Sequence, residues 1–312
     1  MKKFFYVLKK LLLAILIVLI VVVGVAFIYN RVQMRKEEVY WQNPPGQMVE
    51  VDGNKMHIYS EGKGEHTIVF MSAWGDPSPY NQFLPLCKAL NKDFRVVIVE
   101  RFGYGFSDIV DGERDFKTIL ENDRAALKAA GIEGPFILCP HSISGLEATL
   151  WAQNYADEVE GIVGLDMSIK ENKDMKDGET LQNILLGAAK VFNKSGMLRV
   201  IENIGDSTLT EEDKMEQVIT YKILGNKNVV SENRQMDAAC ELIESKPLPS
   251  VPTVQYVAKK TAQDYPLWKS GHQALAEASV DGQYIEMDAG HYLYKEQPGV
   301  IIDGIREFAE KL

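Results

Sequence analysis

The sequence predicts an α/β fold: a mostly parallel eight-stranded sheet flanked by helices, with an inserted helical region and one membrane-spanning helix before it. Three observations carry this prediction. Short apolar runs of strand length alternate with segments of helical periodicity through most of the chain. A charged, amphipathic stretch at 169–249 interrupts the alternation without a convincing strand. The N-terminus carries a long apolar run. Strands that alternate with helices imply parallel pairing with right-handed crossovers.

The composition is that of a globular protein: 312 residues, 46% of them apolar and 25% charged. Three scattered cysteines leave no complete disulfide framework, and five histidines offer little material for a metal site, so we expect neither metal nor cofactor. Residues 1–36 hold seven basic residues and no acidic one, so the formal net charge of −10 becomes −17 for residues 37–312. An acidic body of this kind would repel phosphates, which argues against a nucleic-acid partner.

The N-terminal run LLLAILIVLIVVVGVAFIY, residues 11–29, has no charged residue. Its length is about that needed to cross a hydrocarbon core of roughly 30 Å. A cleaved signal peptide is the alternative, since Gly24-Val25-Ala26 resembles a cleavage site, but that site lies inside the apolar run. We therefore predict an uncleaved anchor at 1–36, with the lipid bilayer as a partner.

The charges around this span predict its orientation. Four lysines precede it, whereas Arg31, Arg35 and Lys36 follow it and are partly offset by Glu37 and Glu38. The excess of positive charge before the span favours a cytoplasmic N-terminus. The rest of the chain is then expected outside the cytoplasm.

After a linker at 37–45, the folded part is expected to begin at the breaker cluster Asn43-Pro44-Pro45-Gly46. A hairpin at 46–62 has a strong two-residue turn signal in Asp52-Gly53. The elements expected next are strands that run into loops at 66–75 and 94–108, a helix at 116–132, a strand at 135–141, a helix at 144–158 and a strand at 159–168. Beyond the inserted region come a strand at 251–258, a helix at about 266–278, a strand at 282–288 and a last helix at 300–312. We therefore predict a core at 46–168 and 250–312 and a helical cap at 169–249.

The segment ILCPHSISGLEA, residues 137–148, places Ser142 between an apolar strand and a helix. Such a turn exposes a serine hydroxyl and leaves helix N-terminal amides free for an oxyanion. The match to the pattern G-x-S-x-G is imperfect, because Pro140 and Ser144 stand in place of the two glycines. Taken alone, the segment fits a nucleophile and an ordinary turn about equally.

A hydrolytic serine also needs a base, and His291 is the candidate. It follows the last expected strand, lies in a loop after Ala289-Gly290, and comes 149 residues after Ser142. A lone histidine in a loop is usually only solvated. Its pairing with the serine turn, in the chain order nucleophile, acid, base, favours the catalytic interpretation.

Five segments in this order resemble the α/β-hydrolase fold superfamily, over roughly residues 46–312. They are the opening hairpin VDGNKMHIYSEG, the oxyanion loop FMSAWGD, the strand and Gly-rich loop VVIVERFGYGFSD, the nucleophile elbow ILCPHSISGLEA, and the histidine loop and last helix DAGHYLYKEQPGVIIDGIREF. The resemblance implies a serine hydrolase with a helical cap. It also implies an oxyanion hole made by the backbone N–H groups of Trp74 and Ile143. The sequence departs from the family at Ser72-Ala73, where His-Gly is common, but backbone donors do not depend on side-chain identity.

Two aspartates compete for the acid behind His291. Asp166 ends the strand after the elbow helix, and Asp264 lies in a polar segment 27 residues before His291. A turn-forming role is the alternative for the first, and simple solvation is the alternative for the second. We favour Asp166, because a strand end holds a carboxylate more rigidly than a long loop.

The resulting hypothesis is a membrane-anchored serine hydrolase that cleaves a small ester, or an amide, through an acyl-enzyme. The cap is expected to pack on the core, with a few side chains facing the pocket, through its apolar positions Ile184, Leu185, Val191, Phe192 and Leu198. Two alternatives stay open: an aminopeptidase that resembles proline iminopeptidases, and a binding module on the same fold without catalysis. A haloalkane dehalogenase needs a carboxylate nucleophile, so Ser142 disfavours that activity.

Overall fold

The structure is a computed structural model that describes residues 2–169, 179–202 and 210–312. One eight-stranded sheet has the order β1-β2-β4-β3-β5-β6-β7-β8. The strands are β1 (Gln47–Val51), β2 (Asn54–Glu61), β3 (Thr67–Met71), β4 (Arg95–Glu100), β5 (Phe136–Pro140), β6 (Val159–Leu165), β7 (Thr253–Ala258) and β8 (Gly282–Met287). Strand β2 pairs in antiparallel fashion with both β1 and β4, and the other strand pairs are parallel, so the predicted mostly parallel sheet is confirmed.

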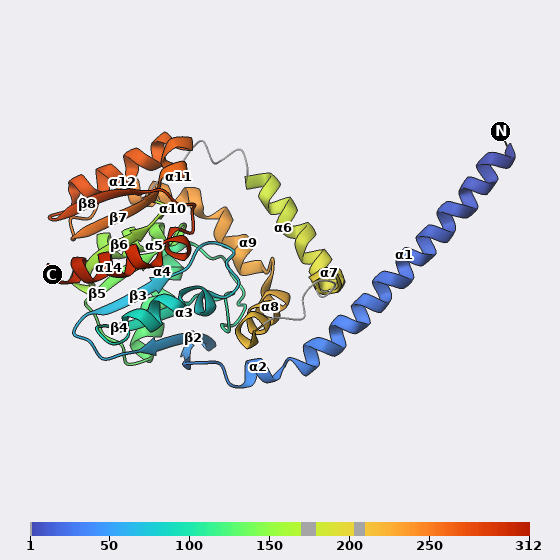
Figure 1. The fold of residues 1–312 in the computed structure, drawn as a ribbon, viewed down its shortest axis with the longest axis horizontal. Coiled ribbons are helices and arrows are strands. Elements are labelled where there is room, and N and C mark those ends of the chain that lie inside the picture. Colours follow the sequence, from blue (N-terminus) through green and yellow to red (C-terminus); the bar gives the residue numbers. More distant parts are fainter. Residues whose placement is uncertain (1, 170–178, 203–209) are drawn as a thin grey trace.

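Helices cover both faces of this sheet (Figure 1). They are α3 (Pro79–Leu90), α4 (Phe116–Ala129), α5 (Ser144–Asn154), α11 (Lys259–Asp264), α12 (Pro266–Ala278), α13 (Leu293–Glu296) and α14 (Pro298–Ala309), with a short 3-10 turn η1 (Ala156–Glu158). One hydrophobic cluster joins α4 and α5 to the sheet, and a second joins α3 and α14 to it. Because both faces are covered, β3, β5 and β7 are buried along their whole length, which explains their continuous apolar runs.

The opening hairpin turns at Asp52 and Gly53, as the sequence predicts. Both residues have positive φ, 50° and 74°, as a type I′ turn requires. This turn matches the twist of β1 and β2, which pair from Val51 and Asn54 outward.

The described residues between β6 and β7 form five helices, which are called here the inserted helices. They are α6 (Glu179–Lys194), α7 (Met197–Glu202), α8 (Glu211–Ile223), α9 (Lys227–Arg234) and α10 (Met236–Glu244). Helix α9 contacts the loops that follow β3 and β4, where the Trp74 indole donates to the Val229 carbonyl (2.8 Å) and the Tyr104 hydroxyl donates to Glu232 (2.8 Å). The inserted helices therefore lie at the carboxyl edge of the parallel strands. The cap boundaries of 169 and 249 stay a prediction.

The predicted packing of the apolar side chains of α6 is wrong. Ile184, Leu185 and Val191 are 62%, 58% and 69% exposed, and Phe192 is also exposed. Leu198, on α7, is half-buried. The spacing 184, 185, 191, 192 does form one helical face, as in an amphipathic helix, but this face lies away from the core.

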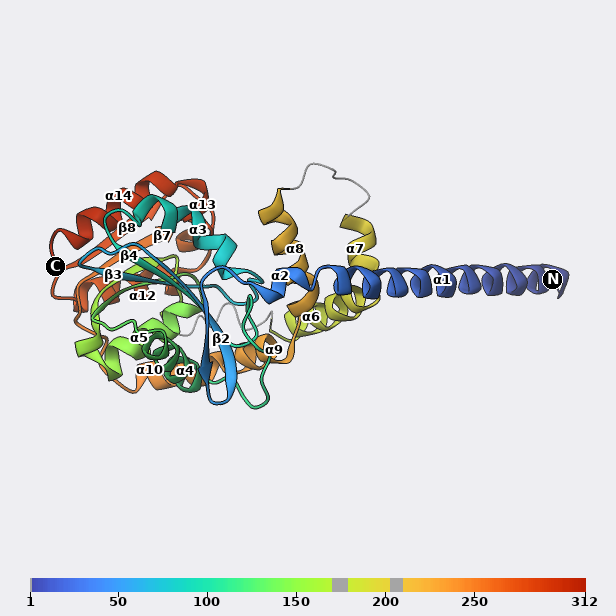
Figure 2. The same cartoon turned by 90° about the horizontal axis from the view of Figure 1, so that it is seen from below.

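The N-terminal helix α1 (Lys2–Lys36) projects from the body and is followed by the short α2 (Val39–Gln42), as Figures 1 and 2 show. Among the described residues, this region holds the one helix that is long and apolar enough to span a membrane. The C-terminal part of α1 packs against α7 and the residue before it. The approach at Gly196 is close, since a Cβ there would lie 2.2 Å from the Ala26 carbonyl oxygen. Arg199 of α7 donates to Asn30 (2.9 Å) and Glu37 (2.6 Å).

Candidate active site

Ser142 lies on the turn between β5 and α5, with a φ of +57°. A non-glycine residue in this region is strained by roughly 1–3 kcal/mol, and such strain persists only where the surroundings impose it. The Ser142 carbonyl accepts hydrogen bonds from the amides of Ser168 (2.7 Å) and Gly145 (3.0 Å). The turn is therefore fixed from both sides, and the serine side chain is half-buried at its tip.

The structure explains both departures from the glycine pattern. Ser144 is fully buried, and its hydroxyl is 2.8 Å from the Met71 carbonyl and 2.9 Å from that of His141, so a glycine would lose these bonds. Pro140 lies where the ladder between β5 and β6 is interrupted, between Leu138 and the isolated bridge at His141. The N–H that proline lacks falls at this interruption, and Pro140 keeps its register with Met71 of β3 on the other side.

The glycine at position 145 is required by a close approach of the backbone. A Cβ there would lie 2.2 Å from the Ser168 carbonyl oxygen.

His291 lies in the loop after β8, and its Nδ1 is 2.7 Å from Oδ2 of Asp166. The Asp166 side chain is completely buried, whereas that of His291 is 37% exposed. The loop is also tied to the serine turn, because Nε2 of His141 is 3.0 Å from the His291 carbonyl oxygen and the two rings lie 4.7 Å apart. The structure thus brings the base candidate beside the residue that precedes Ser142.

Asp166 follows β6 with a φ of +44°. Besides His291, its carboxylate accepts hydrogen bonds from the backbone N–H of Ala258 (3.1 Å), the Thr261 hydroxyl (3.0 Å) and the Trp268 indole (2.9 Å). Each of its two oxygens therefore has two donors, so the carboxylate is held in one orientation.

Asp264 is exposed, and no hydrogen bond joins it to His291 in the described part of the chain. The segment that holds it was expected to be a loop, and this expectation is wrong: it forms α11, which ends at Asp264. The segment 259–264 contains neither glycine nor proline, and Thr261 of its first turn donates to Asp166, which ties the helix to the end of β6.

Trp74 and Ile143, the predicted oxyanion donors, lie in the loop after β3 and at the start of α5. Within the described residues, the backbone N–H of neither donates to an acceptor. Free amides at these two places are available to a ligand atom. The next amide, that of Gly75, donates to the Tyr104 hydroxyl (3.1 Å).

A buried charged cluster behind the Trp74 loop was missed by the sequence analysis. Arg101, which follows β4, is 2% exposed and donates to the carbonyls of Ser72 (2.9 Å) and Ala73 (3.3 Å). The same guanidinium forms an ion pair of 2.9 Å with Glu232 of α9. Arg101 therefore links the loop before Trp74 to the inserted helices. The sequence feature that could have revealed this cluster is a cationic residue, Arg101, directly after an apolar strand.

Burial sets the protonation of several groups near the site. It lowers the pKa of His141 well below its usual range, so this ring is neutral at pH 7. Burial likewise raises the pKa of Glu232, against the opposing effect of Arg101. Among the described residues, no group of three or more His, Cys, Asp or Glu side chains is placed to hold a metal ion.

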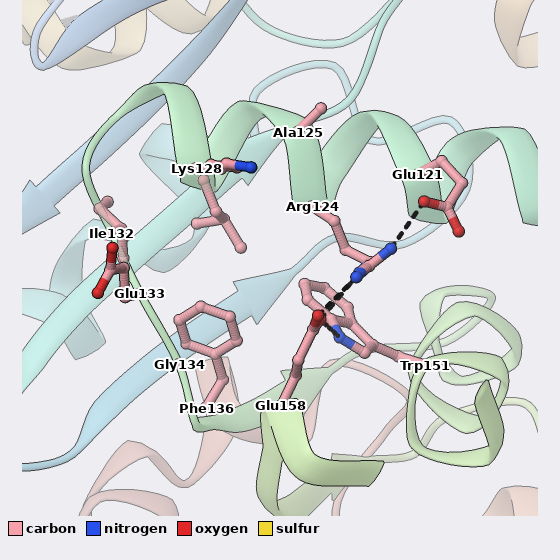
Figure 3. Close-up of a pocket in the computed structure, with 11 residues that line it drawn as sticks. Glu121, Arg124, Ala125, Lys128, Ile132, Glu133, Gly134, Phe136, Trp151 and Glu158 are labelled. Carbon is pink, nitrogen blue, oxygen red and sulfur yellow. Dashed lines mark hydrogen bonds and ion pairs between the residues drawn. The ribbon is translucent and has the colours of Figure 1, made fainter. Parts of the chain in front are cut away.

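A surface pocket of about 420 Å³ lies at the opposite end of β5 (Figure 3). Arg124 in its wall forms ion pairs with Glu121 (2.7 Å) and Glu158 (2.5 Å). Phe136, another lining residue, begins β5, whereas Ser142 follows the end of this strand. Five residues of strand rise about 16 Å, so this pocket is remote from the candidate site.

The sheet order, the flanking helices and the serine turn after β5 define a protein of the α/β-hydrolase fold. No family model matches the chain. Comparison with curated proteins finds YbdG of Bacillus subtilis, described as an uncharacterized protein, 30% identical over 325 residues that cover the whole of both chains. The chain therefore belongs to the same family as YbdG.

Two further comparisons agree with this fold. The pimeloyl-[acyl-carrier protein] methyl ester esterase of Shewanella woodyi is 26% identical over 196 residues, which cover 63% of this chain and 66% of that protein. The crystal structure of an enol-lactonase from Burkholderia xenovorans superimposes with a TM-score of 0.63 at 20% identity, over 85% of this chain and all of the other. The prediction of a hydrolase of the α/β-hydrolase fold is thus confirmed at the level of class.

Proposed function

We propose that this protein is a membrane-anchored serine hydrolase that cleaves a small carboxylic ester through an acyl-enzyme intermediate. The contact of 2.7 Å between His291 and Asp166 is the observation that carries the proposal, because an oriented imidazole beside a strained serine turn is what a serine nucleophile requires. The choice of an ester is supported by the names of two similar proteins. One is the methyl ester esterase of Shewanella woodyi, and the other is the enol-lactonase of Burkholderia xenovorans.

In the proposed mechanism, the Ser142 Oγ attacks the carbonyl carbon while its proton passes to Nε2 of His291. The carbonyl oxygen becomes an oxyanion and accepts hydrogen bonds from the free amides of Trp74 and Ile143. Collapse breaks the bond to the alcohol, which leaves with the proton from His291. A water molecule then attacks the acyl-enzyme by the same steps, releases the acid and restores the serine.

Asp166 holds the imidazole in the tautomer that leaves Nε2 free to accept this proton, and it stabilises the imidazolium that forms. Its four hydrogen-bond donors keep the carboxylate in place before any substrate binds. Asp264 has no part in the proposed reaction.

The proposed anchor is α1, with its span at about residues 11–29, the N-terminus in the cytoplasm and the catalytic part outside. The absence of charge over these residues and the exposure of their apolar side chains support this assignment. We also propose a core at 46–168 and 250–312 and a cap at 169–249, which would restrict the substrate to a small molecule or a slender acyl arm.

Labelling with a fluorophosphonate, which reacts with activated serines, tests the chemistry. The full chain in dodecyl maltoside should be labelled, Ser142→Ala should not, and Ser270→Ala, which removes an exposed hydroxyl of α12, should be labelled like the wild type. Unchanged labelling of Ser142→Ala would contradict the mechanism. No labelling of the wild type, beside a reactive control hydrolase, would favour a binding module.

A further inference from the structure

A basic cavity of about 460 Å³ lies between the C-terminal part of α1 and the inserted helices. Its cationic lining side chains are Arg31, Lys190, Lys194, Lys222 and Lys227, and none of the described lining residues is an aspartate or glutamate. Residues 37–312 carry a formal charge of −17, so a wall with five cations and no carboxylate is unlike the rest of this body. Such a wall attracts an anion.

Three of these cations have partners within the chain. The Arg31 guanidinium lies 5.2 Å from the centre of the Phe27 ring. Lys227 forms an ion pair with Asp111, and the Lys222 ammonium lies 3.4 Å from the centre of the Trp41 ring. Arg31, Lys190 and Lys194 form no ion pair with a carboxylate of the described residues. Three cations without such a carboxylate partner in one cavity are the charge expected for a phosphate or another multivalent anion.

An apolar groove of about 580 Å³ adjoins this cavity along α1. Its lining residues are Leu19, Ile20, Val23, Gly24, Phe27, Lys194 and Ser195. Phe27 and Lys194 line both the basic cavity and the apolar groove, so the two are adjacent. From Leu19 to Arg31 the helix rises about 18 Å, close to the half-thickness of roughly 15 Å of a hydrocarbon core.

The exposed face of α6 fits a position at a membrane surface. In Figure 1, α6 runs crosswise to α1 and approaches it at its C-terminal end. Ile184, Leu185 and Val191 on this face are exposed, and Lys194 follows at the end of the helix. If α1 crosses the bilayer, a helix crosswise to it with an apolar face can lie along the interface.

Contacts between α1 and the region of α7 fix the helices that line the basic cavity and the apolar groove. Arg199 of α7 clamps Asn30 and Glu37, and Gly196 allows close approach at Ala26. Inside the basic cavity, Asn193 is 4% exposed, and its side-chain oxygen has no hydrogen-bond partner in the described part of the chain. The amide nitrogen of Asn193 donates to the Tyr221 carbonyl (2.9 Å), which fixes this side chain in the wall of the cavity.

We propose that this junction binds an anionic phospholipid, with its phosphate among Arg31, Lys190 and Lys194 and one acyl chain in the groove beside Gly24. The proposal rests on the proposed membrane anchor and not on the ester chemistry. A bound lipid would contact both α1 and the inserted helices, through its phosphate in the basic cavity and its acyl chain in the apolar groove. The same cations could bind a soluble phosphate ester, so the test separates these two sources.

The test measures binding of dioctanoyl phosphatidylglycerol, dioctanoyl phosphatidylcholine and glycerol 3-phosphate to the full chain in dodecyl maltoside. Phosphatidylglycerol should bind at least about tenfold more tightly than phosphatidylcholine, with an affinity that falls as salt rises. The double variant Lys190→Gln/Lys194→Gln should lose about tenfold or more of this affinity. The control Lys63→Gln/Lys92→Gln makes the same charge change at two exposed lysines and should bind like the wild type.

Gly24→Leu tests the groove, because a Cβ at Gly24 meets no atom within 4 Å and a leucine would fill the space. It should weaken phosphatidylglycerol binding by severalfold and leave glycerol 3-phosphate binding unchanged. Equal affinity of the wild type for phosphatidylglycerol and phosphatidylcholine would overturn the proposal. So would an unchanged affinity in Lys190→Gln/Lys194→Gln, or glycerol 3-phosphate binding as tight as that of the lipid.

Two separate assays distinguish this failure from failure of the proposed function. Extraction of membranes with alkaline carbonate tests the anchor, since an anchored chain stays in the pellet. Fluorophosphonate labelling tests the serine chemistry and should be the same in Lys190→Gln/Lys194→Gln and in the wild type.

Discussion

Nδ1 of His291 lies 2.7 Å from Oδ2 of Asp166, an aspartate that is completely buried and held by three further donors. These donors, Ala258, Thr261 and Trp268, come from the end of β7, α11 and α12, all beyond the inserted helices. The carboxylate of Asp166, which precedes the insertion, is therefore oriented by chain segments that follow it. This arrangement gives Asp166 a geometry that a solvated aspartate lacks.

Asp166→Asn should lower kcat for an ester substrate by about 10³–10⁴, because an amide in this place favours the wrong imidazole tautomer. Asp264→Asn makes the same chemical change at an exposed residue and should leave kcat within about twofold. Steady-state kinetics with one ester, accompanied by thermal unfolding of each variant, measures both. A large loss in Asp264→Asn with normal activity in Asp166→Asn would reverse the assignment.

Ser142→Gly should raise the free energy of unfolding by about 1 kcal/mol while it abolishes activity. The reason is that Ser142 has a φ of +57°, which glycine adopts without the steric cost of a Cβ. Urea unfolding of the full chain in detergent measures the change. Ser144→Gly is the matched control and should instead destabilise the protein by about 1–3 kcal/mol, because the buried Ser144 hydroxyl bonds to Met71 and His141. Destabilisation in both variants would contradict the strain at Ser142.

Much of the fold follows from local patterns in the sequence. The parallel strands are buried on both faces and so appear as continuous apolar runs, and the Asp52-Gly53 turn has the two positive φ angles that its residues favour. Ser142 and His291 could be proposed because each follows a strand in the expected chain order. The sequence favoured Asp166 over Asp264 only on the expected rigidity of a strand end, because the contact between Asp166 and His291 joins segments far apart in the chain.

Other features could not be predicted, because they depend on contacts between segments far apart in the chain. The apolar periodicity of α6 is the same whether its face packs on a core or is exposed, so exposure of Ile184 and Val191 left no sign in the sequence. The segment that ends at Asp264 is polar, and the hydrogen bond from Thr261 that ties its helix to Asp166 joins residues 95 positions apart in the chain. A single arginine such as Arg101 has a solvated side chain by default, and its burial depends on a partner 131 residues further along the chain.

Arg101→Met should destabilise the protein by about 3–5 kcal/mol, because it leaves Glu232 buried without its cation. It should also lower kcat, since Arg101 holds the carbonyls of Ser72 and Ala73 just before the proposed oxyanion donor Trp74. Adding Glu232→Gln should recover part of the stability but not the loss of kcat. Urea unfolding and ester kinetics of the single and double variants measure both effects. A loss of stability below about 1 kcal/mol would contradict the importance of the ion pair.

Asp123 should make the protein less stable as the pH rises. Burial raises its pKa to about 7, against the opposing charge of Arg101, whereas an unfolded aspartate titrates near 3.9. Between these two values the folded protein keeps a proton that the unfolded chain has lost. The contribution of Asp123 to the free energy of unfolding is therefore full below about pH 4 and falls by up to about 1.4 kcal/mol per pH unit until pH 7.

Asp123→Asn removes this titration, so the stability of the variant relative to the wild type should rise between pH 4.5 and pH 7.5. Urea unfolding of the full chain in detergent at several pH values measures the difference. Burial and the Asp123 charge also raise the pKa of Glu147, so part of the slope will persist in the variant through Glu147. Asp157→Asn makes the same chemical change at an exposed position and is the matched control. A pH-independent difference between Asp123→Asn and the wild type would mean that Asp123 is ionised in the folded protein, with Arg101 as its dominant neighbour.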